Sequence, residues 1–396
     1  MFNAGTAVGK VRPYFLTQAE VDLDKSAPLD KQPGLAAIEE QAGQVAQVLA
    51  GFIDGAAASL DIAIYDFRLL PGDLTGQIVD AVRDAAHRGV TVRLAYDKTV
   101  EAGDGATLKA FGDAGGDPAP TGTHTFIAAA GLPASVQVRA IAEEAIDPGH
   151  QIMHQKYMVR DAGTPEAAVL TGSANFTTDA WGIQDNNVLV IAGAPDLATA
   201  YEQDFAGLWA TQKLAGTGAG DAGTVTLGGV DAGYSFAPGE GRVTEADIAA
   251  LVAGAGSRIR VASMVISSPK ILRALADKIA AGFDVTGIYD GPEMDDVVKQ
   301  WRKHATSSAS QQNLALWQAV APRLTAKASV PFAADGPHNF MHNKVVVADD
   351  TVSTGSFNLS ANATRNAENV LRITSGDLAA QYAAYIDELV LRYAGR

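Results

Sequence analysis

The chain has 396 residues, of which 47% are hydrophobic and 19% are charged, a profile typical of a globular protein large enough for two domains. It contains no cysteine, which excludes disulfides, thiolate nucleophiles and zinc sites with cysteine ligands. The net charge of −15 argues against a protein that coats nucleic acid or docks on anionic lipid, because both functions need a broad basic surface.

The first residues lack a basic end followed by an apolar stretch, so we predict no signal peptide. No uninterrupted apolar run approaches the roughly 18 residues that a membrane span needs. The compartment therefore stays open between the cytoplasm and secretion with the signal already removed. Residues 1–33 match nothing later in the chain, and we predict that they form an appended N-terminal arm.

Residues 34–211 are predicted to form the first of two α/β halves. The apolar segment SLDIAIYDF at 59–67 is typical of a buried strand, and a helical pattern follows at 75–87. Insertions between a strand and a motif often form the walls of a site, and residues 101–135 hold such a place. The remaining predicted elements of this half are a strand at 88–97, HQKYMVRD at 154–161, a glycine-serine turn at 172–176 and a strand at 186–191.

Residues 212–240 are rich in glycine and alanine and are predicted to be a joint. Residues 241–396 then repeat the order of the first half. Strands that alternate with helices predict a mixed or parallel sheet covered on both faces. The repeated elements are a strand at 257–266, a helix at 271–282, a strand at 283–291, an insertion at 292–335, HNKVVVAD at 342–349, a turn at 355–359 and a strand at 368–373.

The repeated motif places a histidine two residues before a lysine. Residues i and i+2 of a strand point to the same face, so His154 and Lys156 should project together, as should His342 and Lys344. A cation on an otherwise apolar strand is a poor structural choice. The alternative, two ordinary surface histidines, is disfavoured because the pattern occurs twice with the same turn after it.

This donor set fits a tetrahedral phosphate, because amides and hydroxyls at the glycine turns join the cations. One neutral imidazole can attack phosphorus while the other, protonated, donates to the leaving oxygen; water or an alcohol then releases the covalent intermediate. No metal or other cofactor is predicted, because the lysines supply the positive charge and the motifs lack a carboxylate cluster. The amide and hydroxyl groups that join the histidines and lysines in this donor set belong to Asn175, Asn358, Ser173 and Ser356.

These residues resemble the phospholipase D superfamily, whose hallmark is His-x-Lys-x4-Asp followed by Gly-Ser-x-Asn, present twice. Both copies match completely, and the resemblance covers about residues 35–396. It implies a phosphodiesterase built from two duplicated phospholipase D-like α/β/α sandwich halves, related by a pseudo-twofold axis, with one active site at their interface. It also implies that Asp161 and Asp349, the last residues of the two motifs, are structural.

The resemblance adds a carboxylate that often holds the far nitrogen of the motif histidine. Glu368 fits that place in the second half, whereas the aligned residue in the first half is Asn186, with Asp185 adjacent. A carboxylate partner makes imidazole more basic, and on this ground His342 should be the more basic histidine. Family resemblance instead favours the first-half histidine, and we predict His154 as the nucleophile and His342 as the acid/base.

Other residues are assigned to substrate binding. These are Ser173, Ser356 and Asn186, together with His150 and His338, which lie four residues before each motif histidine. For His150 and His338 two interpretations stay open: lining of the phosphate entrance, or a loop histidine bonded to backbone. Metal binding by these histidine pairs is disfavoured, because the i, i+4 ligand pattern relies on a helix.

The predicted substrate is a phosphodiester, with water or an alcohol as acceptor. Hydrolysis or head-group exchange on glycerophospholipids is the leading hypothesis, because the chain is acidic and two long insertions could shape an apolar cleft. A nuclease or nucleotide phosphodiesterase is the alternative, with the basic segment WRKH at 301–304 as its best support. A non-catalytic binding protein is disfavoured by two intact motifs. No obligate protein partner is predicted, and a monomer is expected.

Overall fold

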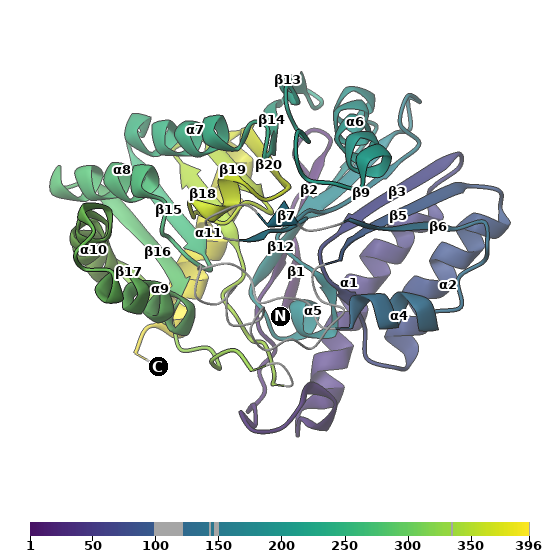
Figure 1. Ribbon diagram of the computed structural model, residues 1–396, viewed down its shortest axis with the longest axis horizontal. Helices are drawn as coiled ribbons and strands as arrows, with labels where there is room; N and C mark the ends of the chain where they lie inside the picture. Colours follow the sequence, from purple (N-terminus) through teal and green to yellow (C-terminus); the bar gives the residue numbers. More distant parts are fainter. Residues whose placement is uncertain (99–121, 142–143, 146–149, 334–335, 396) are drawn as a thin grey trace.

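The computed structural model describes residues 1–98, 122–141, 144–145, 150–333 and 336–395, and at 144, 145 and 150 the backbone alone. Figure 1 shows two α/β halves side by side, the first in purple to teal and the second in green to yellow. Each half contains an eight-stranded sheet with parallel and antiparallel pairs. The predicted fold class, two duplicated α/β halves, is confirmed.

The first sheet is mixed. β3 pairs in parallel with β5, and β5 with β6, whereas the strands from β3 back to β1 pair antiparallel. In spatial order its strands are β1 (Phe2–Ala4), β2 (Val11–Leu16), β12 (Asn186–Ala192), β10 (Ala168–Gly172), β9 (Lys156–Arg160), β3 (Ser59–Ile64), β5 (Thr91–Asp97) and β6 (Gln137–Ile141).

The second sheet repeats this arrangement strand for strand, with parallel pairs at one end and antiparallel pairs elsewhere. Its strands, in the matching spatial order, are β13 (Ala222–Thr226), β14 (Asp231–Ala237), β20 (Glu368–Thr374), β19 (Thr351–Gly355), β18 (Lys344–Ala348), β15 (Arg258–Ser263), β16 (Asp284–Asp290) and β17 (Leu324–Lys327).

The repetition extends further than the sequence comparison indicated. Residues 1–33, expected to be an appended arm, supply β1 and β2, and residues 212–240, expected to be a joint, supply β13 and β14. β2 and β14 occupy equivalent places, each antiparallel to the strand that follows the glycine-serine turn. β13 alternates between exposed and half-buried residues and β1 is mostly exposed, so packing constrains their sequences little. This explains why sequence comparison missed the match.

Helices cover both faces of each sheet. In the first half these are α1 (Leu35–Asp54), α2 (Asp73–His87), α5 (Thr178–Gly182) and α6 (Pro195–Thr211). In the second half they are α7 (Gly241–Gly254), α8 (Pro269–Ala280), α9 (Gly291–Lys303), α10 (Ser308–Val320) and α11 (Gly376–Tyr393). Shorter elements are η1 (Leu29–Lys31), β4 (Phe67–Arg68), α4 (Thr123–Ala129), β7 (Glu144–Ala145), β8 (His150–Gln151), β11 (Phe176–Thr177), η2 (Ala321–Arg323) and η3 (Asn362–Thr364). No helix in the described part of the chain combines the length and the hydropathy that a bilayer crossing requires.

Local sequence signals explain where several helices begin. The side chain of Ser268 accepts a hydrogen bond from the backbone N–H of Ile271 at the start of α8, and Pro269 occupies the first turn. Asp290 caps α9 in the same way through the N–H of Glu293, and Ser375 caps α11. The predicted helices at 75–87 and 271–282 correspond to α2, which begins two residues earlier, and to α8, which begins and ends two residues earlier.

Three apolar cores hold the molecule together. α1 and α2 pack on the outer face of the first sheet, and α7, α8 and α10 pack on that of the second. The third core is shared, because it combines inner-face residues of both sheets with α6 and α11. Tyr201 and Phe205 of α6 and Tyr382 and Ile386 of α11 are fully buried there. The two halves are thus joined by continuous apolar packing, which fixes the active-site interface between them.

One acidic side chain lies inside this shared core. Asp204 of α6 is fully buried, and its Oδ2 accepts hydrogen bonds from the hydroxyl of Tyr157, at 2.7 Å, and from the amide of Gln155, at 2.6 Å. Burial raises the pKa of Asp204 from 3.8 to about 8, although these two hydrogen bonds act in the opposite direction. The folded protein therefore holds this carboxyl protonated at neutral pH.

We predict that Asp204→Asn gains stability over the wild type as pH rises. Above pH 3.8 the unfolded wild type releases the Asp204 proton, whereas the folded protein retains it until about pH 8, so ionisation favours unfolding across this window. The advantage of the variant should grow by up to about 1.4 kcal/mol for each pH unit and level off above pH 8. Urea unfolding of both proteins from pH 4 to pH 9 measures it, and a stability difference that does not change with pH would contradict the assignment.

Candidate active site

Both His-x-Lys motifs stand at the start of a central strand. Lys156 opens β9 and Lys344 opens β18, and each ammonium donates a hydrogen bond of 2.9 Å to the carbonyl of the histidine two residues earlier. All four side chains are almost completely buried. Two buried ammonium groups in one interface make the site locally positive.

The main chain of each motif is anchored by the other half. The backbone N–H of His154 donates to the carbonyl of Ala367 at 2.8 Å, and that of His342 donates to the carbonyl of Asp185 at 3.0 Å. Ala367 and Asp185 immediately precede β20 and β12, the equivalent strands of the two sheets. The structure therefore brings both motif histidines to the interface between the halves.

The imidazole partners also cross this interface, and they differ. Nδ1 of His154 lies 2.8 Å from Oε2 of Glu368, and Nδ1 of His342 lies 3.0 Å from Oδ1 of Asn186. Our expectation that Glu368 serves the histidine of its own half, and so makes His342 the more basic, is wrong. Because the strand that follows each glycine-serine turn begins at the interface, facing the histidine of the other half, the carboxylate partner belongs to His154 and the neutral amide belongs to His342.

The amide of Asn186 is oriented by its own contacts. Its Nδ2 donates to the carbonyl of Ala180 at 3.1 Å and to Oε1 of Gln184 at 3.0 Å, so its Oδ1 must face His342. An amide oxygen only accepts, which leaves Nδ1 of His342 as the donor. The ring therefore presents Nε2 as its proton-exchanging atom.

The serines of the two turns hold these partners in place. The hydroxyl of Ser356 donates to Glu368 at 2.6 Å, and that of Ser173 donates to Asn186 at 2.7 Å. Each serine hydroxyl also accepts a hydrogen bond of 3.0 Å from a backbone N–H, that of Asn187 for Ser173 and that of Asn369 for Ser356. Both are fully buried, and we propose that they position the histidine partners, a role we favour over the direct substrate contact predicted from sequence.

Glycine precedes each serine for a steric reason. Gly172 has φ 154° and Gly355 has φ 144°, values that favour glycine. A Cβ at either position would meet a backbone oxygen of the adjacent strand at 2.2 Å. The absence of a side chain thus lets each turn lie close to the strand that carries the histidine partner.

The motif aspartates have structural contacts. Asp161 accepts hydrogen bonds from three successive backbone N–H groups, those of residues 57 to 59, and Asp349 does the same at residues 256 to 258. Both aspartates lie outside the cluster of histidines and lysines. The geometry agrees with the structural role that the resemblance implied.

The two motif asparagines, Asn175 and Asn358, are both buried. The Oδ1 atom of Asn175 accepts no hydrogen bond from any described residue. Asn175 and His342 line one small pocket together. An orphaned buried acceptor beside a proton-exchanging imidazole is well placed to contact a bound molecule.

Tyr65 is a residue of the site that the sequence did not predict. Its fully buried ring lies edge-on to His154 with centroids 5.0 Å apart, and the ammonium of Lys156 stands 5.0 Å from its centroid. The ring face is attractive to a cation, so Tyr65 stabilises the lysine. The second sheet carries Met264 at this place, and comparison of the repeats therefore gave no signal.

His150 and His338 lie four residues before the motif histidines. The His150 side chain lies outside the described residues. His338 stacks between Phe332 and Phe340, with ring centroids 5.0 and 5.5 Å away. Its Nε2 lies 2.8 Å from the carbonyl of Ala333 and its Nδ1 lies 3.1 Å from Asp179. His338 thus bonds backbone and also lines the pocket beside His342.

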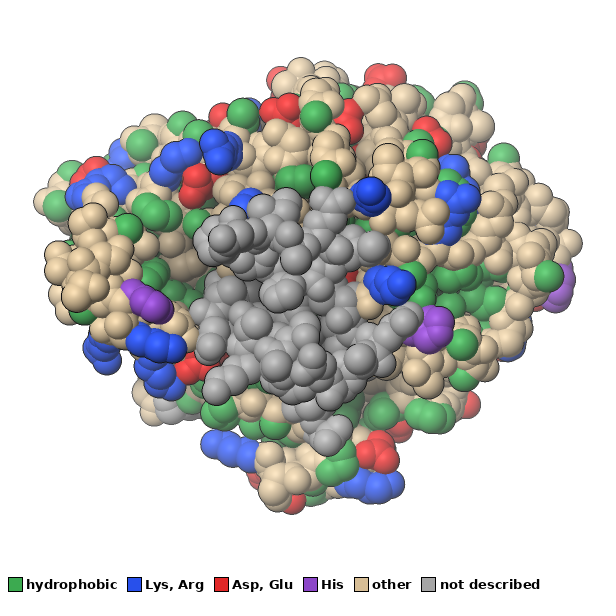
Figure 2. Space-filling view, in the orientation of Figure 1, with side chains coloured by type: hydrophobic (Ala, Val, Ile, Leu, Met, Phe, Trp, Pro, Cys, Tyr) green, Lys and Arg blue, Asp and Glu red, His purple; other side chains and the backbone are tan. Residues whose placement is uncertain are grey.

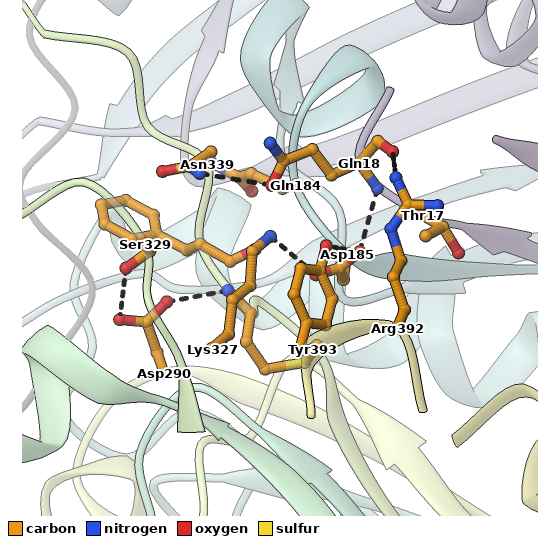
Figure 3. A network of polar contacts seen from close by, with 12 residues as sticks. Thr17, Gln18, Gln184, Asp185, Asp290, Lys327, Ser329, Asn339, Arg392 and Tyr393 are labelled. Atoms are coloured by element: carbon orange, nitrogen blue, oxygen red, sulfur yellow. Dashed lines mark hydrogen bonds and ion pairs between the residues drawn. The ribbon is translucent and has the colours of Figure 1, made fainter. Parts of the chain in front are cut away.

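Asp185, whose carbonyl accepts the N–H of His342, belongs to a buried network of polar contacts (Figure 3). The ammonium of Lys327 lies 2.7 Å from Oδ2 of Asp185, and both side chains are almost fully buried. Asp185 also accepts the N–H of Gln18 at 2.9 Å and the hydroxyl of Tyr393 at 3.2 Å. The network therefore ties the N-terminal segment, the first half and α11 to the chain around His342.

Each motif is further fixed by an aspartate at the end of a parallel strand. Asp290 accepts the N–H of Met341 at 2.8 Å, and Asp97 accepts that of Met153 at 2.5 Å. Burial raises the pKa of Asp290 to about 6, against hydrogen bonds from Ser329 and Met341. These equivalent contacts set the position of the residue before each motif histidine.

Within the described ranges, no group of three or more histidine, aspartate or glutamate side chains is arranged to hold a metal ion. The cluster instead contains two ammonium groups, two imidazoles, neutral amides and one carboxylate. This donor set suits a phosphate oxyanion.

A family model described as "Cardiolipin synthase, PLD-like domain" matches residues 49–209 and 248–390. The solved structure of phosphatidylserine synthase from Haemophilus influenzae Rd KW20 is similar with a TM-score of 0.56 and 14% identity, over 88% of this chain and 84% of that one. Polyphosphate kinase from Porphyromonas gingivalis gives a TM-score of 0.52 and 12% identity, over 94% of this chain and 51% of that one. Nuc, a phospholipase D family member from Salmonella typhimurium, gives a TM-score of 0.30 and 24% identity, over 41% of this chain and 94% of that one. No curated protein sequence matches the chain.

Proposed function

Because this chain belongs to the phospholipase D superfamily, whose members act on phosphodiester bonds, we propose that it cleaves or exchanges such bonds through a covalent phosphohistidine. The observation that carries the proposal is the crossed pairing at the interface, where each buried histidine is oriented by the other half. Two lysines beside them supply the positive charge that a phosphate requires.

We assign the nucleophile to His154. When Nε2 of an imidazole bonds to phosphorus, the ring becomes cationic and keeps that charge for the life of the intermediate. The carboxylate of Glu368 accepts a hydrogen bond from the Nδ1–H of His154 and would stabilise this charge. The same contact fixes the tautomer in which the lone pair of Nε2 is available for attack.

We assign the acid and base to His342. A neutral amide at Nδ1 holds the ring in place and adds no negative charge, so the ring is suited to both giving and taking a proton. Its Nε2 proton passes to the leaving oxygen as the phosphorus–oxygen bond breaks and the bond to His154 forms. His342 then takes a proton from water or an alcohol, whose oxygen displaces His154 from phosphorus.

The remaining donors hold the phosphate. Lys156, Lys344, Asn175 and Asn358 surround the histidines and would contact the non-bridging oxygens, where charge is concentrated in the transition state. This step requires no metal ion, since the lysines neutralise the oxyanion. One chain supplies every group named, so a monomer is the proposed functional unit.

A glycerophospholipid is the proposed substrate. The matching family model is described for cardiolipin synthase, an enzyme named for a phospholipid product. The chain carries a net charge of −15, and Figure 2 shows lysine and arginine side chains as separate patches over the described residues of the face in view. A nuclease usually needs a continuous basic groove to follow a nucleic-acid backbone.

Parallel assays test the substrate class. We expect turnover of phosphatidylglycerol or phosphatidylcholine in mixed micelles and of bis-p-nitrophenyl phosphate, all with EDTA present, and no cleavage of single-stranded DNA. Cleavage of DNA without lipid turnover would replace the lipid proposal by a nuclease. Activity that EDTA abolishes and a metal restores would overturn the metal-free step.

A further inference from the structure

A charged cluster lies beside His342 and takes no part in the proposed chemistry. Arg68, at the end of β4, lies 3.1 Å from Asp66 and 3.6 Å from Asp179, and His338 contacts Asp179 from the second half. All four residues line the pocket that also contains Asn175 and His342. The second half has Ser267 and Val265 where the first has Arg68 and Asp66, so the active site has one charged side.

Both carboxylates of the cluster are already satisfied. Asp66 accepts from Arg68 through one oxygen and from the hydroxyl of Thr123, at 3.0 Å, through the other. Asp179 accepts from the hydroxyl of Thr177 and the N–H of Ala180, while its second oxygen faces His338 and Arg68. Burial opposes the ionisation of Asp179, but Arg68 and His338 outweigh it and hold its pKa below the usual value. No carboxylate here remains to pair with a cationic ligand.

Arg68, by contrast, has donors to spare. Its Nε is hydrogen-bonded to Asp66, and no described residue accepts a hydrogen bond from its Nη1. The side chain is 28% exposed, in contrast to the buried residues around it. Across the pocket, Oδ1 of Asn175 is buried and accepts nothing from the described residues. A hydroxyl can accept a hydrogen bond from Nη1 of Arg68 and donate one to Oδ1 of Asn175.

The pocket is small. Its cavity measures about 20 Å³, room for roughly one water molecule, and Phe332 and Phe340 wall it on one side. A hydroxyl fits such a space, whereas three methyl groups on a nitrogen do not. The size of the cavity and its hydrogen-bonding groups therefore both favour a hydroxyl.

We propose that Arg68 is a specificity-determining residue: with Asn175 it binds a hydroxyl of the leaving alcohol, or of the acceptor alcohol, and so selects polyols over quaternary ammonium alcohols. The proposal rests on the proposed function, in which the leaving oxygen departs toward the acid His342. By microscopic reversibility an acceptor enters by the same route. The pocket adjoins His342, so this is the side of the site where the alcohol lies.

Equilibrium binding of three phosphomonoesters to the full chain tests this without catalysis. The probes are glycerol 3-phosphate, n-propyl phosphate, which has the same charge and no hydroxyl, and phosphocholine. Titration calorimetry should show glycerol 3-phosphate binding roughly tenfold more tightly than either other probe. In Arg68→Gln this preference should fall at least fivefold.

Arg260→Gln is the matched control, because Arg260 also bridges two aspartates, Asp284 and Asp387, away from the motif residues. It should keep the wild-type preference. Arg68→Lys retains a charge between Asp66 and Asp179 but loses the guanidinium fork, so it should also lose most of the preference. A preference that is absent in the wild type, or unchanged in both Arg68 variants, would overturn the proposal while leaving the phosphate site intact. If none of the three probes binds, the phosphate site itself is wrong and both proposals fall.

Discussion

Replacing His154 by alanine will reduce turnover of every phosphodiester substrate by about 10⁴-fold or more, because no covalent intermediate can form. His342→Ala should behave differently. A substrate with a good leaving group, such as bis-p-nitrophenyl phosphate, needs no acid, so it should still phosphorylate His154. Without the base, release should be slow, and the phosphorylated protein should accumulate after a burst of p-nitrophenol.

Stopped-flow absorbance and intact-protein mass spectrometry measure the burst and the adduct. His304→Ala is a matched control, because His304 follows α9, away from the motif residues, and the substitution should leave the rate unchanged. A burst in His154→Ala, or equal behaviour of the two motif variants, would show that the roles are not divided as proposed.

The second large effect is on stability. Lys327→Met should lower the free energy of unfolding by about 3–5 kcal/mol, because it leaves the carboxylate of Asp185 buried and without its ion-pair partner. Asp185→Asn combined with Lys327→Met should recover much of this loss, since the buried charge is then gone. The pair lies behind His342, whose N–H bonds the carbonyl of Asp185, so the single variant should also lose activity.

Denaturant unfolding of the full chain measures the difference. Lys299→Met is the control: Lys299 is paired with Asp296 at the same distance, 2.7 Å, but its side chain is 71% exposed. An exposed pair contributes about 1 kcal/mol or less. Similar losses in the two lysine variants would mean that the buried pair adds no more than a surface pair.

Much of the site could be predicted because it is written in local sequence. The spacing of His154 and Lys156 on a strand, the glycine-serine turn after them and the repetition of both in the second half needed no tertiary information. The strands that carry the motifs are largely apolar after their lysines, so their burial also followed.

The partner assignments could not be predicted in this way. Glu368 lies in the same half as His342, and only the way the two sheets face each other places it beside His154. Lys327 lies 142 residues from Asp185, and its place in the first sheet is taken by Ile141, so the repeat gave no hint of the pair. Arg68 ends a two-residue strand that no periodicity marks. The first two contacts depend on how the two halves meet, and those of Arg68 depend on the tertiary packing within the first half, neither of which local patterns contain.

The central claim is that His154, paired with Glu368, carries the phosphoryl group. The direct measurement is to quench a turnover mixture of the wild-type enzyme and a labelled phosphodiester, digest it under alkaline conditions that preserve phosphohistidine, and map the label by tandem mass spectrometry. We expect label on His154 alone and its loss in His154→Ala. Label on His342, or turnover with no labelled histidine at all, would contradict the account.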